Sequence, residues 1–300
     1  ASAINAQSAL NSNVQQYTTD NGLPSNGIKG IQWDEKTEFL WLSTEAGIVR
    51  FNGVDFKSFT KQNMPEIGSE RMLFLVRNKA GNIYTSDQPG NIFQIDQSRP
   101  VLWKKAAILN STKNLQIGQY YLLAISENLF KSKVAQPRQE RFSMGNNRVV
   151  YISDTSCFIQ NGNTLYYYSV TSPDPIPLPV EEKNINSIFR VKDKHFIINN
   201  QKEIFILDPK TKKHTPVSTS GSGISLLKAA GKSSLFFWQM GMDYPVFIEA
   251  EKAWMLNYDG ATINATLITS NIPTDSYIKS VQYSEKNNLL FIGTESRGLI

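Results

Sequence analysis

The chain has 300 residues and a mass of 33.8 kDa, which suits one large domain or two smaller ones. Hydrophobic residues make up 40% of it and charged residues 19%, so it can bury a core and is not disordered by composition. A net charge of +5 is mild for this length, and one cysteine with two histidines excludes a disulfide framework and a cysteine-based metal cluster. We therefore expect no metal, no cofactor and no nucleic-acid partner.

Short runs of alternating apolar and polar residues, bounded by Gly, Asn, Asp, Ser and Pro, dominate the chain and indicate strands and turns. In chain order they include 39–44, 47–53, 82–87, 91–96, 164–170, 195–200 and 203–208. Only two polar residues separate the last two runs, which is typical of a hairpin. No segment shows helical periodicity over about ten residues, so the predicted fold class is all-β.

The segment 23–49 recurs near the end of the chain, at 272–300. The identical pairs, each 250 residues apart, include Ile28/Ile278, Lys29/Lys279, Gln32/Gln282, Leu40/Leu290, Thr44/Thr294 and Glu45/Glu295. Apolar positions and turn residues follow the same offset. Such internal repetition is typical of propellers, in which the first and last repeats are neighbours.

The offset divides into six steps of about 42 residues, the length of a four-stranded propeller blade, or five steps of about 50. Between the two copies, strand clusters start near Arg71, Leu115, Arg148, Asn186 and Gly223. The sequence therefore predicts a seven-bladed β-propeller of four-stranded antiparallel blades, favoured over six or eight. The Pro-rich stretch 172–180 is expected to connect two of these clusters.

Both ends of the sequence bear on how the propeller closes. The last copy lacks an outermost strand after Ile300, and the strand-like run 14–19 precedes the first copy without a partner. A terminal strand that completes the last blade would leave few open sheet edges. We expect residues 14–19 to close the ring with the last blade. Residues 1–13 are then an N-terminal extension, and 14–300 form a single domain, the first module of a longer protein.

A dense motif spans residues 18–60. Its residues are Asp20, Gly22, Leu23, Pro24, Ser25, Asn26, Ile28, Ile31, Asp34, Leu40, Trp41, Thr44, Gly47, Arg50, Phe51 and Gly53. In this order they resemble the two-component-regulator propeller repeat. The copy at 272–300 keeps the apolar and glycine positions but departs from the motif at Asp275 and Ser284. Most motif residues are expected to shape turns or to pack between blades.

The resemblance implies a location and a role. Such repeats build the extracytoplasmic sensor part of large bacterial histidine kinases, including hybrid two-component systems of Bacteroidetes-type bacteria. It implies a periplasmic part of an inner-membrane protein, followed in the same chain by a further propeller or a β-sandwich. We also expect the full-length protein to form a homodimer. In several such proteins the ligand is a breakdown product of a polysaccharide. The 300 residues contain no kinase machinery, so no enzyme is predicted for this segment.

Ligand-binding candidates come from the loops that we expect at one face of the propeller. They are Asn26, Arg71, Arg148 and Arg297, together with the loop 239–245 and its flanking Trp238. Trp238 and Tyr244 could stack on a sugar ring, and Asp243 could accept its hydroxyl groups. The alternative is a core position for Trp238 and an ordinary solvated loop for the others.

Two functions therefore stay open from the sequence. The first is a periplasmic ligand-sensing propeller of a two-component sensor histidine kinase, responding to an oligosaccharide. The alternative is a non-catalytic propeller that serves as a scaffold for protein–protein interaction. A propeller lyase or hydrolase would need clustered His, carboxylate or Tyr side chains, and the sequence shows no such cluster.

Overall fold

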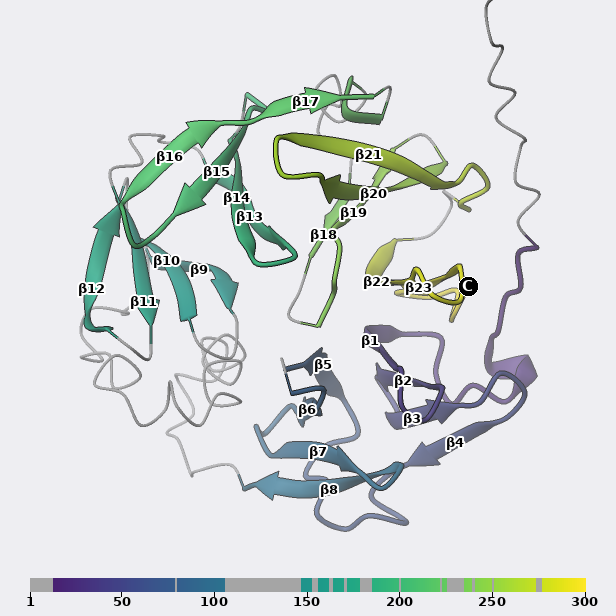
Figure 1. Cartoon of the computed structure of the whole chain (residues 1–300). Helices are drawn as coiled ribbons and strands as arrows, with labels where there is room; N and C mark the ends of the chain where they lie inside the picture. Colours follow the sequence, from purple (N-terminus) through teal and green to yellow (C-terminus); the bar gives the residue numbers. More distant parts are fainter. Residues whose placement is uncertain are drawn as a thin grey trace, which may run out of the picture.

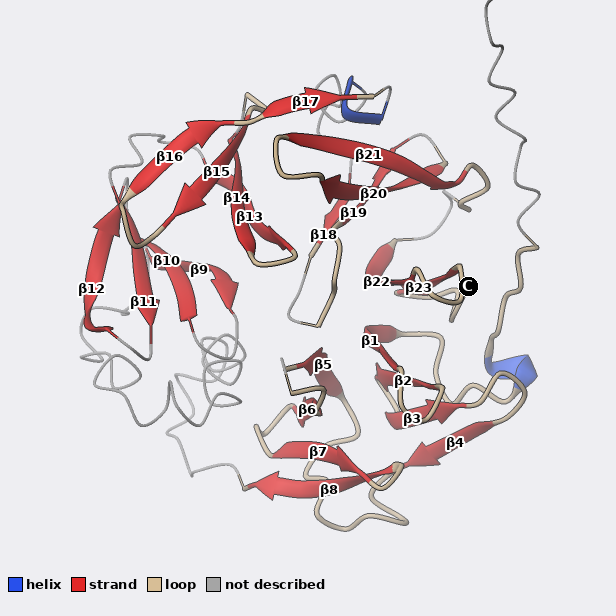
Figure 2. Ribbon diagram, in the orientation of Figure 1, coloured by secondary structure: helices blue, strands red, loops and turns tan. Residues whose placement is uncertain are grey.

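The computed structural model describes residues 13–78, 80–105, 147–152, 156–161, 164–169, 172–178, 185–199, 201–221, 223–225, 235–238, 241–249, 251–273 and 277–300. Nearly all of this chain is strand or turn, which confirms the all-β prediction (Figure 2). Helix within these ranges is limited to the 3₁₀ turn η1 (Thr19–Asn21) and one turn at 223–225.

Four sheets have four antiparallel strands each, and consecutive strands are neighbours within them. The first sheet holds β1 (Ile28–Asp34), β2 (Phe39–Thr44), β3 (Gly47–Phe51) and β4 (Phe56–Phe59). The second holds β5 (Met72–Arg77), β6 (Ile83–Asp87), β7 (Ile92–Asp96) and β8 (Arg99–Lys104). The third holds β9 (Asn147–Ile152), β10 (Ser156–Asn161), β11 (Thr164–Ser169) and β12 (Ser172–Leu178). The fourth holds β13 (Ile185–Val191), β14 (Lys194–Asn199), β15 (Ile204–Asp208) and β16 (Lys213–Pro216).

The two remaining sheets depart from this pattern. One has five strands in the order β17-β21-β20-β19-β18, with β17 parallel to β21. Its strands are β17 (Ser218–Ser220), β18 (Leu235–Phe237), β19 (Val246–Glu249), β20 (Lys252–Tyr258) and β21 (Thr262–Thr269). The last sheet pairs only β22 (Ile278–Ser284) with β23 (Leu289–Thr294). Near Gly223, where a strand cluster was expected, residues 223–225 form a helical turn, and the innermost strand described in this sheet is β18.

The sheets are arranged around a common centre, as Figure 1 shows. β1 packs against β5 on one side and against β22 on the other, so the first and last sheets are neighbours. The described residues hold six sheets. The strand cluster expected near Leu115 lies outside the described residues, so the number of blades stays a prediction.

Apolar side chains fill the spaces between neighbouring sheets. Trp41 of β2 is completely buried and packs with Leu75 and Phe93 of the second sheet. On the other side of the first sheet, Ile31 lies in one cluster with Leu299. The expectation that motif residues such as Trp41 and Ile31 pack between blades is confirmed.

The N-terminal segment is joined to the end of the chain by a bridge between Tyr17 and Leu299 and by a 2.9 Å hydrogen bond from Gln16 Nε2 to Arg297 O. Tyr17 N donates to Leu299 O at 2.8 Å, and Leu299 N donates to Tyr17 O at 3.0 Å. Leu299 in turn forms a bridge with Gly293 of β23. The ring of Tyr17 lies edge-on to that of Phe51, with 4.8 Å between the centroids. The run 14–19 is thus a single bridge followed directly by η1 rather than a continuous strand.

Candidate functional site

Three charged side chains meet at the N-terminal ends of β1 and β5. Glu45, in the turn between β2 and β3, forms an ion pair with Lys29 through one carboxylate oxygen. Its other oxygen lies 3.3 Å from Nε of Arg71, the residue before β5. Glu45 therefore links the first sheet to the second. The Lys29 side chain is only 17% exposed and that of Arg71 is 53% exposed, so Arg71 is the more accessible cation.

The last sheet repeats this arrangement. Lys279 Nζ lies 3.4 Å from Oε2 of Glu295, and these residues are the repeat equivalents of Lys29 and Glu45. The ammonium group also lies 4.2 Å from the ring centroid of Tyr277, an aromatic residue that is 63% exposed. Exposed ion pairs contribute at most about 1 kcal/mol to stability, so the fold gains little from this repetition.

Two more predicted site residues lie at the same end of the inner strands. Gly298 N donates to Asn26 O at 3.1 Å, which brings the exposed Arg297 beside the entry to β1. The Asn26 side chain accepts a 2.9 Å hydrogen bond from Thr19 N and so helps to hold η1. The structure brings Asn26, Arg71 and Arg297 to this end. We call it the Arg71 end, made up of Lys29, Glu45, Arg71, Tyr277, Lys279, Glu295 and Arg297.

Arg148 is described only through its backbone. It is the second residue of β9 and pairs with Gln160 of β10. It therefore lies at the N-terminal end of its strand, as Arg71 lies at the N-terminal end of β5.

The structure corrects the expectation that the loop 239–245 shares a face with Asn26 and Arg71. Asp243 Oδ2 lies 3.5 Å from Nη2 of Arg77, the last residue of β5. Tyr244 hydrogen-bonds to Glu285, which follows β22. Both contacts are at the C-terminal ends of inner strands. β18 is the innermost strand of its sheet, so the loop that follows it lies at the C-terminal end of an inner strand, opposite to Arg71.

The two aromatic candidates occupy different surroundings. Trp238 is partly buried and packs against three core clusters, which is the structural alternative weighed from the sequence. Tyr244 is partly exposed, and burial, together with the adjacent charge of Glu285, raises the pKa of its hydroxyl group. Tyr244 is therefore a neutral phenol that donates to the Glu285 carboxylate.

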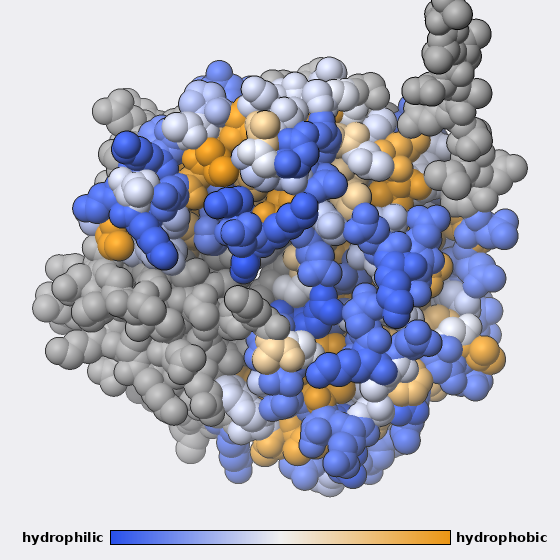
Figure 3. Space-filling view, viewed as in Figure 1, coloured by the Kyte–Doolittle hydropathy of each residue, from blue (hydrophilic) through white to orange (hydrophobic). Residues whose placement is uncertain are grey.

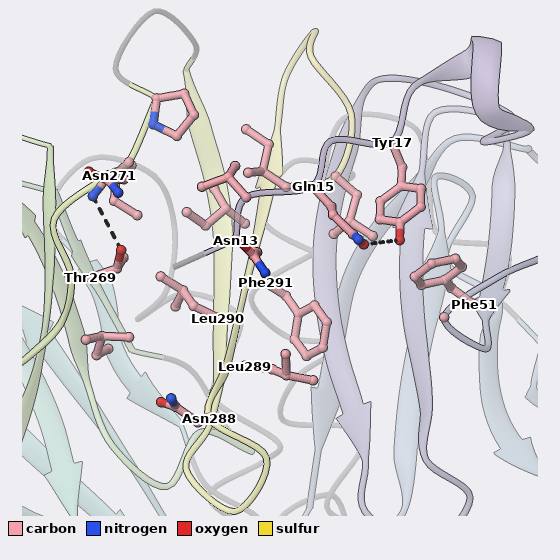
Figure 4. A pocket seen from close by; sticks show the side chains of 18 residues that line it. Asn13, Gln15, Tyr17, Phe51, Thr269, Asn271, Asn288, Leu289, Leu290 and Phe291 are labelled. Carbon is pink, nitrogen blue, oxygen red and sulfur yellow. Dashed lines mark hydrogen bonds between the residues drawn. The ribbon is translucent and has the colours of Figure 1, made fainter. Parts of the chain in front are cut away.

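A pocket of about 540 Å³ lies elsewhere, beside the outer edge of β23. In Figure 4, Gln15 and Tyr17 of the N-terminal segment stand on one side of it and Thr269 and Asn271 on the other. Leu290 of β23 belongs to its mainly apolar lining. None of the predicted site residues lines this pocket. In the complete sheets, third and fourth strands occupy the corresponding position, so the pocket follows from the two-stranded extent of this sheet.

Within the described ranges, no three His, Cys, Asp or Glu side chains are grouped so that they could hold a metal ion. No helix of the described chain is long and apolar enough to cross a membrane. Hydrophilic residues dominate the area around the centre in the view of Figure 3.

Sequence reasoning did not select Glu45, Tyr277 or Glu295 as site residues. The signal was present, because the Lys29–Glu45 spacing returns unchanged as Lys279–Glu295. When a sequence is compared with a repeat motif, identical residues of this kind are interpreted as requirements of the fold and not as site residues. The structure shows that they form the same ion pair twice at one end of the molecule.

Comparison with known proteins identifies the class of fold. No family model matches the sequence, and no curated protein matches it. The WD40 repeats of RRP9 superpose with a TM-score of 0.52 at 10% identity, over 95% of this chain and 94% of that one. The chain therefore has a β-propeller fold.

Bacterial surface proteins also match. The extracellular domain assigned to a hybrid two-component system of B. thetaiotaomicron gives a TM-score of 0.45 at 11% identity, over 95% of this chain and 41% of that one. PorZ, a component of the type-IX secretion system of Porphyromonas gingivalis, gives 0.45 at 10% identity, over 94% of this chain and 32% of that one. This chain thus spans about a third to two-fifths of these two structures.

Proposed function

We propose that this chain is the periplasmic ligand-sensing module of a two-component sensor histidine kinase and that it responds to an oligosaccharide. The supporting observation is the repeated lysine–glutamate pair at the Arg71 end. Both copies lie in the segments that resemble the two-component-regulator repeat. Because the partly exposed Lys279–Glu295 pair adds little stability, recognition at this surface is the better reason for the repetition.

The chemistry of the Arg71 end suits a sugar. The carboxylates of Glu45 and Glu295 accept hydrogen bonds from hydroxyl groups, and the guanidinium of Arg71 donates to hydroxyl or carboxylate oxygens. The exposed ring of Tyr277 offers a flat apolar face on which a sugar ring can stack. A ligand held by Glu45 and Arg71 touches two sheets at once, so it would favour one relative arrangement of those sheets.

The proposal includes the organisation of the whole sensor. We propose seven blades, with residues 14–19 completing the last blade and residues 14–300 forming the first module of a longer protein. The bridge between Tyr17 and Leu299 and the contact of β1 with β22 support this closure. A further propeller or β-sandwich would follow in the same chain, and the full-length sensor would be a homodimer.

The test is a thermal-shift screen of neutral and acidic oligosaccharides. We expect at least one sugar to raise the melting temperature in a saturable way. The shift should be lost in Arg71→Gln and in Tyr277→Ala, because both remove groups from the Arg71 end. It should persist in Lys210→Gln, which removes an exposed cation from an outer turn between β15 and β16.

Two results would count against this function. A flat response to the whole panel would overturn oligosaccharide sensing by this module and favour the protein-interaction scaffold. A shift that survives both Arg71→Gln and Tyr277→Ala would place the sugar elsewhere on the molecule.

A further inference from the structure

The segment Gly241–Pro245, which we call the strap, contacts sheets other than its own. It precedes β19 and reaches across the centre of the molecule towards β5, as Figure 1 shows. Gly241 lies against Gln32 of β1 and Arg77 of β5. Tyr244 bonds to Glu285 beyond β22. One short segment thus contacts β1 and β5 across the centre and, through Glu285, the end of β22 in the neighbouring sheet.

The contact with Arg77 is the central attachment. Arg77 Nη2 donates to Gly241 O at 2.7 Å, and the Arg77 side chain is only 16% exposed. A charge-assisted bond of this kind, partly shielded from water, is among the stronger hydrogen bonds in proteins. The Asp243 carboxylate, 77% exposed and 3.5 Å away, is a weaker second partner.

Gly241 is the residue type that this approach requires. Its φ of +103° lies in the left-handed region. A Cβ atom there would lie 2.6 Å from Cβ of Arg77 and 2.8 Å from Oε1 of Gln32. Any larger residue would therefore push the strap away from β1 and β5.

The closed strap also carries a cost. Gln32 is completely buried, and neither of its amide atoms has a hydrogen-bond partner among the described residues. Gly241 helps to cover this amide, because a Cβ atom on it would lie only 2.8 Å from Gln32 Oε1. A buried amide without partners is unfavourable, so lifting the strap would recover part of what the Arg77 bond and the burial of Met242 provide. The closed and open positions are thereby brought closer in free energy.

We propose that the strap is a reversible closure of the centre of the propeller at the end opposite Arg71, latched by Arg77. The inference rests on contacts within the chain and does not depend on the proposed function. If the sugar screen is flat and the strap behaves as described below, only the sensing proposal fails.

The test measures opening in the intact chain by hydrogen exchange. We expect Arg77→Gln to raise the exchange rate of the peptide 241–249 about ten- to a hundredfold, the factor that corresponds to one charge-assisted hydrogen bond. The peptide 252–258, which is β20, should keep its rate. Asp243→Asn is the matched control and should leave both rates close to the wild-type values, because its carboxylate is exposed.

Methionine oxidation supplies a second readout and a second variant. Met242 lies in the strap and is 7% exposed, whereas Met72 of β5 is completely buried. Both Arg77→Gln and Gly241→Ala should speed peroxide oxidation of Met242 and leave Met72 unchanged. Unchanged Met242 oxidation in both variants would overturn the proposal. So would equal acceleration at Met242 and Met72, because it would show general loosening of the fold.

Discussion

At the scale of single residues, the first and last sheets each place a glycine opposite a serine, but on opposite strands of the pair. Gly30 of β1 lies opposite Ser43 of β2, and Ser280 of β22 lies opposite Gly293 of β23. A Cβ atom on Gly30 would lie 2.9 Å from Ser43 Oγ, and one on Gly293 would lie 2.8 Å from Ser280 Oγ. Each facing pair of residues has room for only one serine side chain. Neighbouring sheets constrain the two glycines as well, because a Cβ atom on Gly30 would lie 2.6 Å from Leu75 N and one on Gly293 would lie 2.6 Å from Cγ2 of Ile28.

Trp41 gives a direct test of the packing between sheets. It is completely buried, and its ring stacks on that of Phe59 with 6.0 Å between the centroids. We expect Trp41→Ala to lower the free energy of unfolding by about 3–5 kcal/mol, as for other large aromatic residues removed from cores. Urea denaturation measures it. Val54→Ala, at a position 77% exposed, is the control that should change nothing, and a Trp41→Ala variant as stable as this control would contradict the assignment.

His195 predicts a dependence of stability on pH. Burial, followed by the charge of Arg190, lowers the pKa of His195 to about 4 from the usual 6.5. The unfolded chain binds a proton at this histidine below pH 6.5, and the folded chain does so only near pH 4. Stability is therefore full above pH 6.5 and falls as the pH drops towards 4. Between pH 7 and pH 5 the loss is about 2 kcal/mol.

The variant that tests this is His195→Gln, which cannot titrate. Urea midpoints of both proteins are compared at pH 7 and at pH 5. The wild type should lose more stability than the variant over this interval. Equal losses would show that His195 is charged in the folded state or accessible to water.

At the scale of elements, alternating apolar patterns located most strands, because burial on one face of a sheet imposes a period of two. The segments 39–44 and 164–170 fall on β2 and β11 nearly residue for residue. The pattern failed at 172–180, where prolines indicated a connection and the structure has β12 instead. β12 is the edge strand of its sheet, and an edge tolerates proline because half of its N–H groups need no partner.

The N-terminal segment is the element whose removal tests the closure of the propeller. Deleting residues 1–19 removes the Tyr17–Leu299 bridge and the contact of Tyr17 with Phe51. We expect a melting temperature lower by about 5–10 °C, the shift that corresponds to about 3 kcal/mol in a domain of this size. Deleting residues 1–12 alone keeps the bridge and is the control. Equal melting temperatures for the two deletions would contradict closure by this segment.

At the scale of the whole molecule, the sequence predicted the positions of some candidate residues but not of others. Asn26, Arg71 and Arg297 were expected at one end and lie there, because Asn26 and Arg297 belong to the two copies of the repeat and Arg71 immediately precedes an inner strand. Asp243 and Tyr244 were expected there as well but do not lie there, because the end at which a loop lies alternates with every strand that precedes it. The repeat motif is faint between 223 and 245, so the sequence did not show that this loop follows an inner strand.

The bond between Arg77 and Gly241 joins two sheets that are not neighbours. In a circle of sheets that touch only their neighbours, small tilts add up and the circle can become oval. A hydrogen bond across the middle fixes the distance between the two sheets that it joins, at the end where the strap lies. Glu45 joins the first two sheets at the Arg71 end. A force that spreads these sheets there must then tilt them about the bond between Arg77 and Gly241. The tilt is therefore smallest where the strap holds the sheets and larger at the Arg71 end.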